Sequence, residues 1–173
     1  VYKRQFLQIC CQSSWQFEDA DPKLNQNRVI DTLLLNETLN QIDHWLICSN
    51  LSAHALGGID RAADDLAELG DRAKARGLRI GFEALAWGRH INDHRDAWEV
   101  VRRADHSHVG LILDSFHTLS RRIDPDTIRA IPGDKIFFVQ LADAPLIDMD
   151  LFYWSRHFRN MPGEGELPVV DFM

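Results

Sequence analysis

The chain has 173 residues, of which 45% are hydrophobic, a length and composition typical of one soluble domain with a sizeable core. Its formal net charge is −7, and acidic and basic residues are interspersed, which argues against the basic surface of a nucleic-acid-binding protein. No apolar run approaches the roughly 20 residues of a membrane span, no signal peptide is visible, and the three cysteines form no CxxC pair, so we expect a reducing, cytoplasmic location.

The predicted elements alternate between strand and helix along the chain. Short apolar runs predict the strands, and apolar residues at helical spacing predict the helices. In the first half of the chain we expect a strand at 6–11, a helix at 24–41, a strand at 44–49 and a helix at 59–76. In the second half we expect a strand at 78–83, a helix from 93 to about 104, a strand at 109–114, a short helix at 124–131 and a strand at 135–143. A long polar and aromatic loop, 144–168, follows.

The helix ends carry recognisable signals. Gly77 is expected to end the second helix, and Asn92 or Asp93 to cap the third. Asp124 is expected as the cap of the fourth helix, with Pro125 in its first turn.

This order of elements predicts an α/β fold. Continuous apolar strands are buried on both faces and belong to a parallel sheet, and right-handed crossovers bring every strand's carboxyl end to one edge. Five strand candidates cannot close an eight-stranded barrel. The chain does not begin with Met, and it stops at Met173 just as an apolar segment begins. We therefore expect residues 1–173 to be a single, incomplete domain of a longer protein.

Polar side chains follow the tips of three predicted strands. Glu83 and Asp114 each end an apolar strand, and Gln140 lies near the end of a third. A carboxylate in so apolar a strand is costly unless it is paired. Three oxygen ligands, two of them anionic, suit a divalent cation such as Mg²⁺ or Mn²⁺. The alternative is that these residues separately satisfy loop amides, because strand-end carboxylates are common in α/β proteins.

Other titratable residues lie near this edge. His117 follows Asp114 by three residues, which makes it a candidate for catalysis, although a lone histidine in a loop also serves as a hydrogen-bonding group. An arginine on this face would suit a carboxylate-bearing substrate. The further polar residues expected on this face are Arg89, His90, Ser155, His157 and Arg159. For His54, His94 and Arg156 we favour solvated loop positions.

The strand-end order of Glu, then Asp with a nearby His, then Gln resembles the xylose isomerase-like sugar phosphate isomerase/epimerase superfamily of metal-dependent TIM barrels. More narrowly, four segments resemble the bacterial 3-dehydroshikimate dehydratases. They are GFEALAWGRHIND (81–93), LDSFH (113–117), FVQLADAP (138–145) and YWSRHFRNMPGEG (153–165). The resemblance, close over 48–168, implies a partial TIM barrel with five to six β/α units that lacks the first and last strands.

The resemblance also implies roles for individual residues. The family has a fourth metal ligand, a Glu on the eighth strand, which is expected beyond Met173; Glu164 and Glu166 do not match it. Glu83, Asp114 and Gln140 match metal ligands of the family, for Mg²⁺, Mn²⁺ or Co²⁺. The positions that line its substrate pocket match His117, Ser155 and Arg159. We expect His117 and Glu83 to be catalytic, and Ser155, Arg159 and His90 to bind the substrate.

The activity that the resemblance implies is dehydration of 3-dehydroshikimate to protocatechuate in quinate and shikimate catabolism. The metal would stabilise an enediolate, His117 would perform acid/base work, and Arg159 would hold the substrate carboxylate. The expected partner is thus a small molecule, with no nucleic acid and no membrane. A sugar (phosphate) isomerase or epimerase that reprotonates the same enediolate is the first alternative. The second is an inactive fragment.

Overall fold

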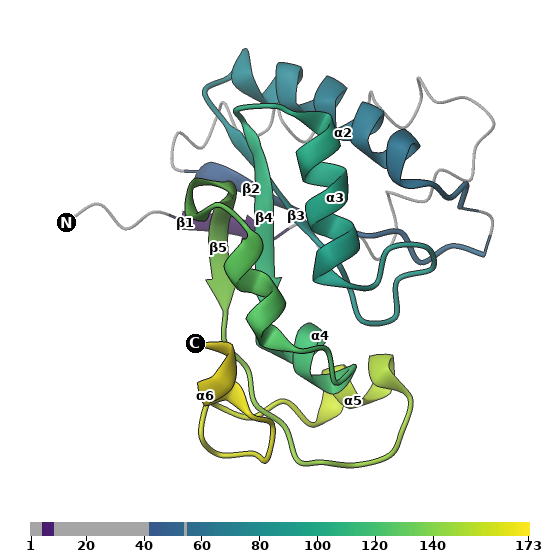
Figure 1. The fold of residues 1–173 in the computed structure, drawn as a ribbon, viewed down its shortest axis with the longest axis vertical. Helices are drawn as coiled ribbons and strands as arrows, with labels where there is room; N and C mark the ends of the chain where they lie inside the picture. Colours follow the sequence, from purple (N-terminus) through teal and green to yellow (C-terminus); the bar gives the residue numbers. More distant parts are fainter. Residues whose placement is uncertain (1–4, 9–41, 54) are drawn as a thin grey trace.

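The computed structural model describes residues 5–8, 42–53 and 55–173, and its strands form one parallel sheet (Figure 1). The five strands lie side by side in chain order. They are β1 (Gln5–Gln8), β2 (Ile42–Cys48), β3 (Arg79–Glu83), β4 (Val109–Asp114) and β5 (Ile136–Gln140). Because every neighbouring pair is parallel, the carboxyl ends of the strands meet at one edge, as predicted.

The strand predictions are confirmed with small shifts. The first is observed as β1, and the rest of that prediction lies outside the described residues, as does the helix predicted at 24–41. The last strand was predicted to run through 143 but ends at Gln140. The Ser115 hydroxyl donates to the carbonyl of Ala142 at 2.7 Å and accepts from its N–H at 2.8 Å. These bonds occupy the backbone groups that a continued strand would use.

Two helices lie over one face of the sheet, α2 (Ile59–Lys74) and α3 (His94–Ala104) (Figure 1). The end of α2 follows the prediction, because Gly77 has a positive φ of 67° and the N–H of Leu78 reaches back to the carbonyl of Ala73 at 2.9 Å. Asp93 caps α3 by accepting from the N–H of Arg95.

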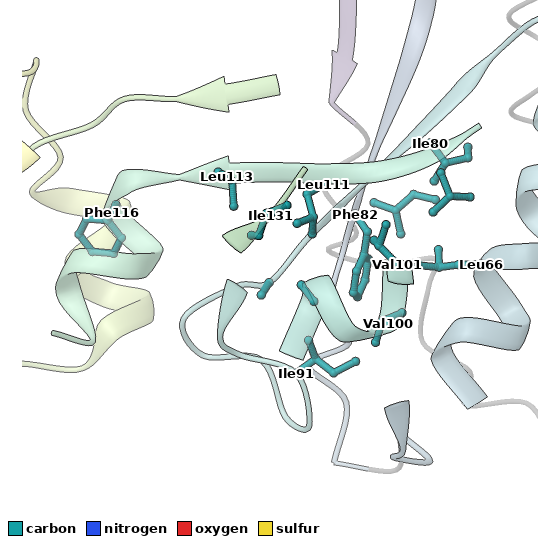
Figure 2. Close-up of a cluster of buried hydrophobic side chains, with 14 of the residues drawn as sticks. Leu66, Ile80, Phe82, Ile91, Val100, Val101, Leu111, Leu113, Phe116 and Ile131 are labelled. Carbon is teal, nitrogen blue, oxygen red and sulfur yellow. The ribbon is translucent and has the colours of Figure 1, made fainter. Parts of the chain in front are cut away.

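The core lies between these helices and the sheet (Figure 2). Leu66 of α2 and Val100 and Val101 of α3 pack in one cluster with Ile80 and Phe82 of β3, and each of the five is at most 5% exposed. Truncating a large buried side chain of this kind costs about 2–5 kcal/mol. The packing therefore holds β3 firmly, including the carboxylate at its tip.

Short helices connect and follow the last two strands, and some of them were not expected. They are α4 (Ser115–Ser120), η1 (Pro125–Ala130), η2 (Gly133–Lys135), α5 (Leu151–His157) and α6 (Val169–Phe172). Asp124 caps η1 as predicted, although η1 is a 3₁₀ helix. The prediction of a continuous loop at 144–168 is wrong, because α5 lies within it. The apolar and aromatic residues of α5 form one consecutive run, 151–154, and not the spaced pattern that predicts a helix.

Burial on both faces was predicted for every strand and holds for β4, in which all residues are buried. It fails for β5, where Phe138 is 39% and Val139 45% exposed. In the described part of the chain, β5 is the edge strand of the sheet and pairs only with β4. Its side chains are therefore only partly covered. A search of the described residues finds no helix long and apolar enough to cross a membrane.

Candidate metal centre

Three titratable side chains meet where β3 and β4 end. Glu83 is the last residue of β3, Asp114 is the last of β4, and His117 lies in α4. Each offers one ligand atom, these atoms all lie within 4.8 Å of one another, and all three side chains are buried. By distance alone the three could hold a divalent cation, and the two carboxylates are ligands that such a cation prefers. The predicted convergence of Glu83 and Asp114 is confirmed.

Asp114 uses its two oxygens differently. Oδ1 accepts the N–H of Phe116 at 2.8 Å and so caps the helix that follows the strand. Oδ2 faces the cluster, where it accepts from Nη1 of Arg159 at 2.6 Å and lies 3.7 Å from Nε2 of His117. One oxygen therefore fixes the carboxylate in place and leaves the other for exchangeable partners.

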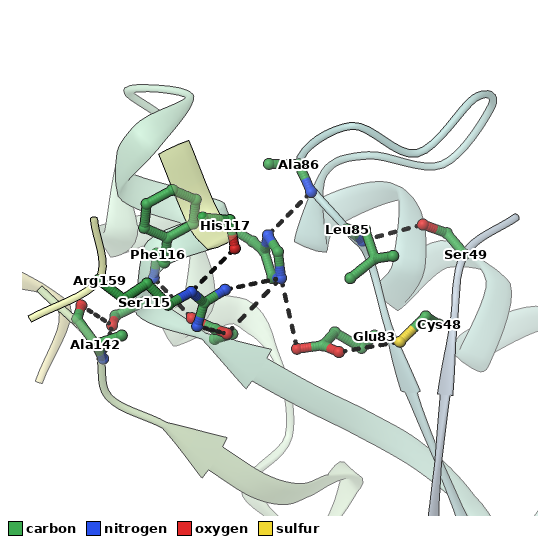
Figure 3. Close-up of polar contacts among 12 residues, drawn as sticks. Cys48, Ser49, Glu83, Leu85, Ala86, Ser115, Phe116, His117, Ala142 and Arg159 are labelled. Carbon is green, nitrogen blue, oxygen red and sulfur yellow. Dashed lines mark hydrogen bonds and ion pairs between the residues drawn. The ribbon is translucent and has the colours of Figure 1, made fainter. Parts of the chain in front are cut away.

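His117 is oriented by the loop after β3 (Figure 3). Its Nδ1 accepts the backbone N–H of Ala86 at 3.1 Å, so the neutral ring carries its proton on Nε2. The 3.4 Å approach of Nε2 to Nη2 of Arg159 is then a contact between two donors. The pKa of His117 is lowered to about 4, because burial and, to a lesser extent, the charge of Arg159 outweigh the opposing effect of Asp114. The ring also packs edge-to-face against Trp87, with centroids 5.0 Å apart.

Glu83 is 2% exposed and is held from the neighbouring strand. Cys48 is its register partner on β2, and the thiol donates to Oε2 at 3.3 Å. Oε1 lies 3.9 Å from Nε2 of His117. Glu83 therefore presents one oxygen to the thiol and the other to the cluster.

Arg159 brings a positive charge to the cluster from the segment after α5. Besides its bond to Asp114, its Nε donates to the hydroxyl of Ser155 at 3.0 Å, and its guanidinium lies 4.6 Å from the ring centre of Phe116. Ser155 and Arg159 were predicted to lie on the same face as Asp114, and these contacts agree with that prediction. Ser155 belongs to a helix, however, and not to the loop predicted there.

Two of the other predicted site residues have a less direct relation to the cluster. Gln140 is half-buried and is the register partner of Asp114, one strand further along the sheet. His90 is exposed, and its Nε2 contacts the carbonyl of Ala55 at 2.9 Å; its described contacts do not join it to the cluster.

Three further histidines were considered from the sequence, and none of them has a described contact with the cluster. His157 is exposed and packs on Tyr153, with ring centroids 4.2 Å apart. His54 lies outside the described residues. A solvated position for His94 is wrong, because the ring is 6% exposed and contacts the hydroxyls of Thr118 and Thr127. These contacts join the start of α3 to α4 and η1.

Three contributors to the cluster were not singled out from the sequence. The Cys48 thiol and the Ala86 amide reach it through tertiary contacts that no local pattern reveals. Trp87 also packs against Phe152 of α5 and so lies between that helix and His117. The one signal for Trp87 in the sequence was its position in the segment 81–93, which resembles the dehydratases.

Comparisons with known proteins agree with this architecture. The family model of the xylose isomerase-like TIM barrel matches residues 6–173. Over 131 residues, or 76% of this chain, the sequence is 59% identical to 3-dehydroshikimate dehydratases of Pseudomonas putida and Pseudomonas aeruginosa. An inosose isomerase of Bacillus subtilis is 29% identical over 109 residues, which are 62% of this chain and 38% of that protein. The chain spans about a fifth of the two dehydratases, 21% of each.

Solved structures show the same fold. A fusion protein of a xylose isomerase-like TIM barrel and a 4-hydroxyphenylpyruvate dioxygenase is 54% identical, with a TM-score of 0.84 over 87% of this chain and 24% of that one. The IOLI protein, solved with a bound zinc atom, has a TM-score of 0.75 at 22% identity, over 88% of this chain and 56% of that one. The described sheet is accordingly part of a barrel, and the chain belongs to the xylose isomerase-like TIM barrel family.

Proposed function

We propose that this chain contributes the active site of a metal-dependent 3-dehydroshikimate dehydratase, a hydro-lyase that forms protocatechuate. The observation that carries the proposal is the buried cluster of Glu83, Asp114 and His117, with Arg159 directed at it. This cluster occurs in a chain that is 59% identical, over most of its length, to proteins of that name. The substrate is a ring with a ketone, hydroxyl groups and a carboxylate, and the cluster offers a group for each.

Glu83, Asp114 and Gln140 are the residues that would hold the cation. Two carboxylates and an amide oxygen suit Mg²⁺, Mn²⁺ or Co²⁺. A bound divalent cation supplies Lewis acidity, which stabilises the negative charge that forms when the proton beside a ketone leaves. His117 is less suited to be a ligand. A neutral imidazole that binds metal through Nε2 carries its proton on Nδ1, and here Nδ1 accepts the N–H of Ala86.

His117 is instead assigned to acid/base work. Its Nε2 bears the proton and lies between the carboxylates of Glu83 and Asp114. From there it can donate a hydrogen bond to a substrate oxygen that is gaining negative charge or departing. Burial keeps the ring neutral at neutral pH, so that the ring acts as a donor without placing a second positive charge beside Arg159.

Arg159 is assigned to the substrate carboxylate. A guanidinium binds a carboxylate through two parallel hydrogen bonds, and Ser155 and the ring of Phe116 fix the plane of this one. In the overall reaction the proton next to the ketone and the β-hydroxyl leave together as one water. Tautomerisation then makes the ring aromatic.

The test is an activity assay on the purified protein. With Mn²⁺ and 3-dehydroshikimate present, we expect protocatechuate absorbance to appear, and EDTA to abolish it. Asp114→Asn should remove most of it, because Asp114 is proposed both as a ligand and as the partner of Arg159. Exposed Asp148 offers a matched control, and Asp148→Asn should keep full activity. If the metal-loaded protein forms no protocatechuate, the dehydratase proposal is wrong.

One observation favours a second candidate, an isomerase. The inosose isomerase of Bacillus subtilis is related to the chain at 29% identity. An isomerase would use the same cation but return the proton to the carbon skeleton. Supplying an inosose in the same assay distinguishes the two, since turnover of the inosose without protocatechuate formation would favour the isomerase.

A further inference from the structure

A third buried carboxylate follows the end of β5 and has a different set of partners from Glu83 and Asp114. Asp143 is 2% exposed. Its Oδ1 accepts the N–H groups of Ala144 at 2.8 Å and Leu167 at 3.0 Å, and its Oδ2 accepts those of Gly163 and Gly165, both at 3.0 Å. Four backbone donors thus converge on one side chain. None of the proposed catalytic roles uses it.

These bonds shape the segment that follows α5. The N–H of Asp143 donates to the carbonyl of Asn160 at 3.0 Å, and the N–H of Asn160 donates back at 2.8 Å. Further along, Gly165 approaches so closely that a Cβ atom there would lie 2.4 Å from Oδ1 of Asp143. We call residues 160–167 the return segment; its path is set by bonds to Asp143 at both ends.

The return segment begins immediately after Arg159. Its first residue, Asn160, is tied to the backbone of Asp143, and Arg159 reaches from there to Oδ2 of Asp114. On the other side, Ala142 is held by both hydrogen bonds to Ser115, the neighbour of Asp114. Asp143 is therefore connected to the cluster along two short routes, one through the strand end and one through Arg159.

We propose that Asp143 is a positioning residue that holds Arg159 over the metal cluster and so sets the affinity for the substrate carboxylate. The proposal rests on the dehydratase function proposed above. The structural reason is that a carboxylate accepts all four amides, whereas an asparagine side chain has one oxygen and would direct an NH₂ group at two N–H donors. Asp143→Asn should release the return segment and with it Arg159.

A double-mutant cycle tests whether Asp143 acts through Arg159. We expect Arg159→Ala to lower kcat/KM by about 100-fold and Asp143→Asn by about 10-fold, mostly through KM, as for the loss of charge-assisted hydrogen bonds. The double variant should lose about 100-fold rather than the product of about 1,000-fold that independent sites give. A double variant whose loss in kcat/KM equals the two single losses multiplied together would overturn the proposal. Glu164→Gln, at an exposed acid in the return segment, is the control and should leave kcat/KM unchanged.

A second readout does not require dehydratase activity. Phenylglyoxal labels arginine side chains, and Arg159 can be compared with exposed Arg156 in the same digest by mass spectrometry. We expect Asp143→Asn to raise the labelling of Arg159 relative to Arg156 by about ten-fold, the range of one lost charged hydrogen bond. A lack of protocatechuate formation by the unsubstituted protein would overturn the proposed function and leave this readout valid.

Gly165→Ala covers the case in which Asp143→Asn does not fold. It keeps the carboxylate and forces the return segment away from Oδ1 of Asp143. We expect the same rise in Arg159 labelling and the same shift in KM. An unchanged labelling ratio in a folded Gly165→Ala or Asp143→Asn protein would show that Arg159 is held independently of Asp143, and the proposal would fail.

Discussion

Asp114 and Asp143 are both buried aspartates at the carboxyl edge of the sheet, and their partners differ. Asp143 binds four backbone amides, which cannot leave without unfolding the segment that carries them. Asp114 binds one amide with Oδ1, while Oδ2 faces the side chains of Arg159 and His117, which can rotate away. A carboxylate of the first kind organises the backbone, and one of the second kind can take a ligand.

The same contrast is visible in electrostatics. Burial alone would raise the pKa of Asp143, but the hydrogen bonds from Gly165, Ala144, Leu167 and Gly163 outweigh it and hold the pKa below its usual value. At the cluster, burial lowers the pKa of His117 to about 4. Backbone N–H groups therefore stabilise the charge of Asp143. The charge of Asp114 is balanced by Arg159, a side chain that is proposed to bind the substrate carboxylate.

The largest effect on activity is expected when Asp114 loses the carboxylate charge that faces the cluster. Asp114→Asn should lower kcat/KM by about 10³-fold, because a metal ion contributes several kcal/mol to the transition state. Calorimetric titration with Mn²⁺ should show weakened binding as well. Asp143→Asn should retain Mn²⁺ binding, because its partners are backbone groups. If both variants lost Mn²⁺ affinity equally, Asp114 and Asp143 would not differ in the way proposed, one as a metal ligand and the other as a backbone anchor.

A second test separates charge from position at Arg159. Arg159→Lys keeps the charge but loses the planar fork, so KM should rise by about 10-fold or more while kcat changes less. Arg156→Lys is the matched control, since Arg156 is exposed on α5 and its guanidinium lies over the ring of Phe152 at 5.2 Å. Steady-state kinetics with 3-dehydroshikimate measure both. A change in kcat alone would argue against a carboxylate-binding role.

The depressed pKa of His117 predicts how stability depends on pH. The ring titrates at about 4 in the folded chain and at its ordinary 6.5 in the unfolded chain. Between these values the unfolded state binds more protons, so stability falls as pH decreases. From pH 7 to pH 5, the loss should be about 2 kcal/mol from this residue. Buried His94, whose pKa is also lowered by burial, adds a loss of the same sign.

Urea unfolding at the two pH values, in EDTA, measures this loss. His117→Gln should flatten the dependence in part, and His94→Gln should remove a separate part. An undiminished slope in His117→Gln would show that the ring is not the group that titrates.

The sequence was informative where a feature is local. Apolar runs placed the strands, Gly77 and Asp93 placed the ends of helices, and the tips of β3 and β4 placed two carboxylates together, because parallel strands end at one edge. Features that depend on side-chain contacts between distant segments were not accessible. Helix α5 has a single buried residue, and Asp143 stood near a predicted strand end with nothing local to indicate its four amide partners.

The smallest expected effect concerns the thiol beside Glu83. Cys48 donates to Oε2 from the adjacent strand, and a group that orients a ligand in this way typically changes metal affinity by about 10-fold when it is lost. Cys48→Ala should therefore weaken Mn²⁺ binding by up to about 10-fold in a calorimetric titration. Cys48→Ser keeps a donor of similar size and should restore most of the affinity. If serine and alanine weaken binding equally, the thiol acts by packing with Leu46 and Ile112 rather than by orienting Glu83.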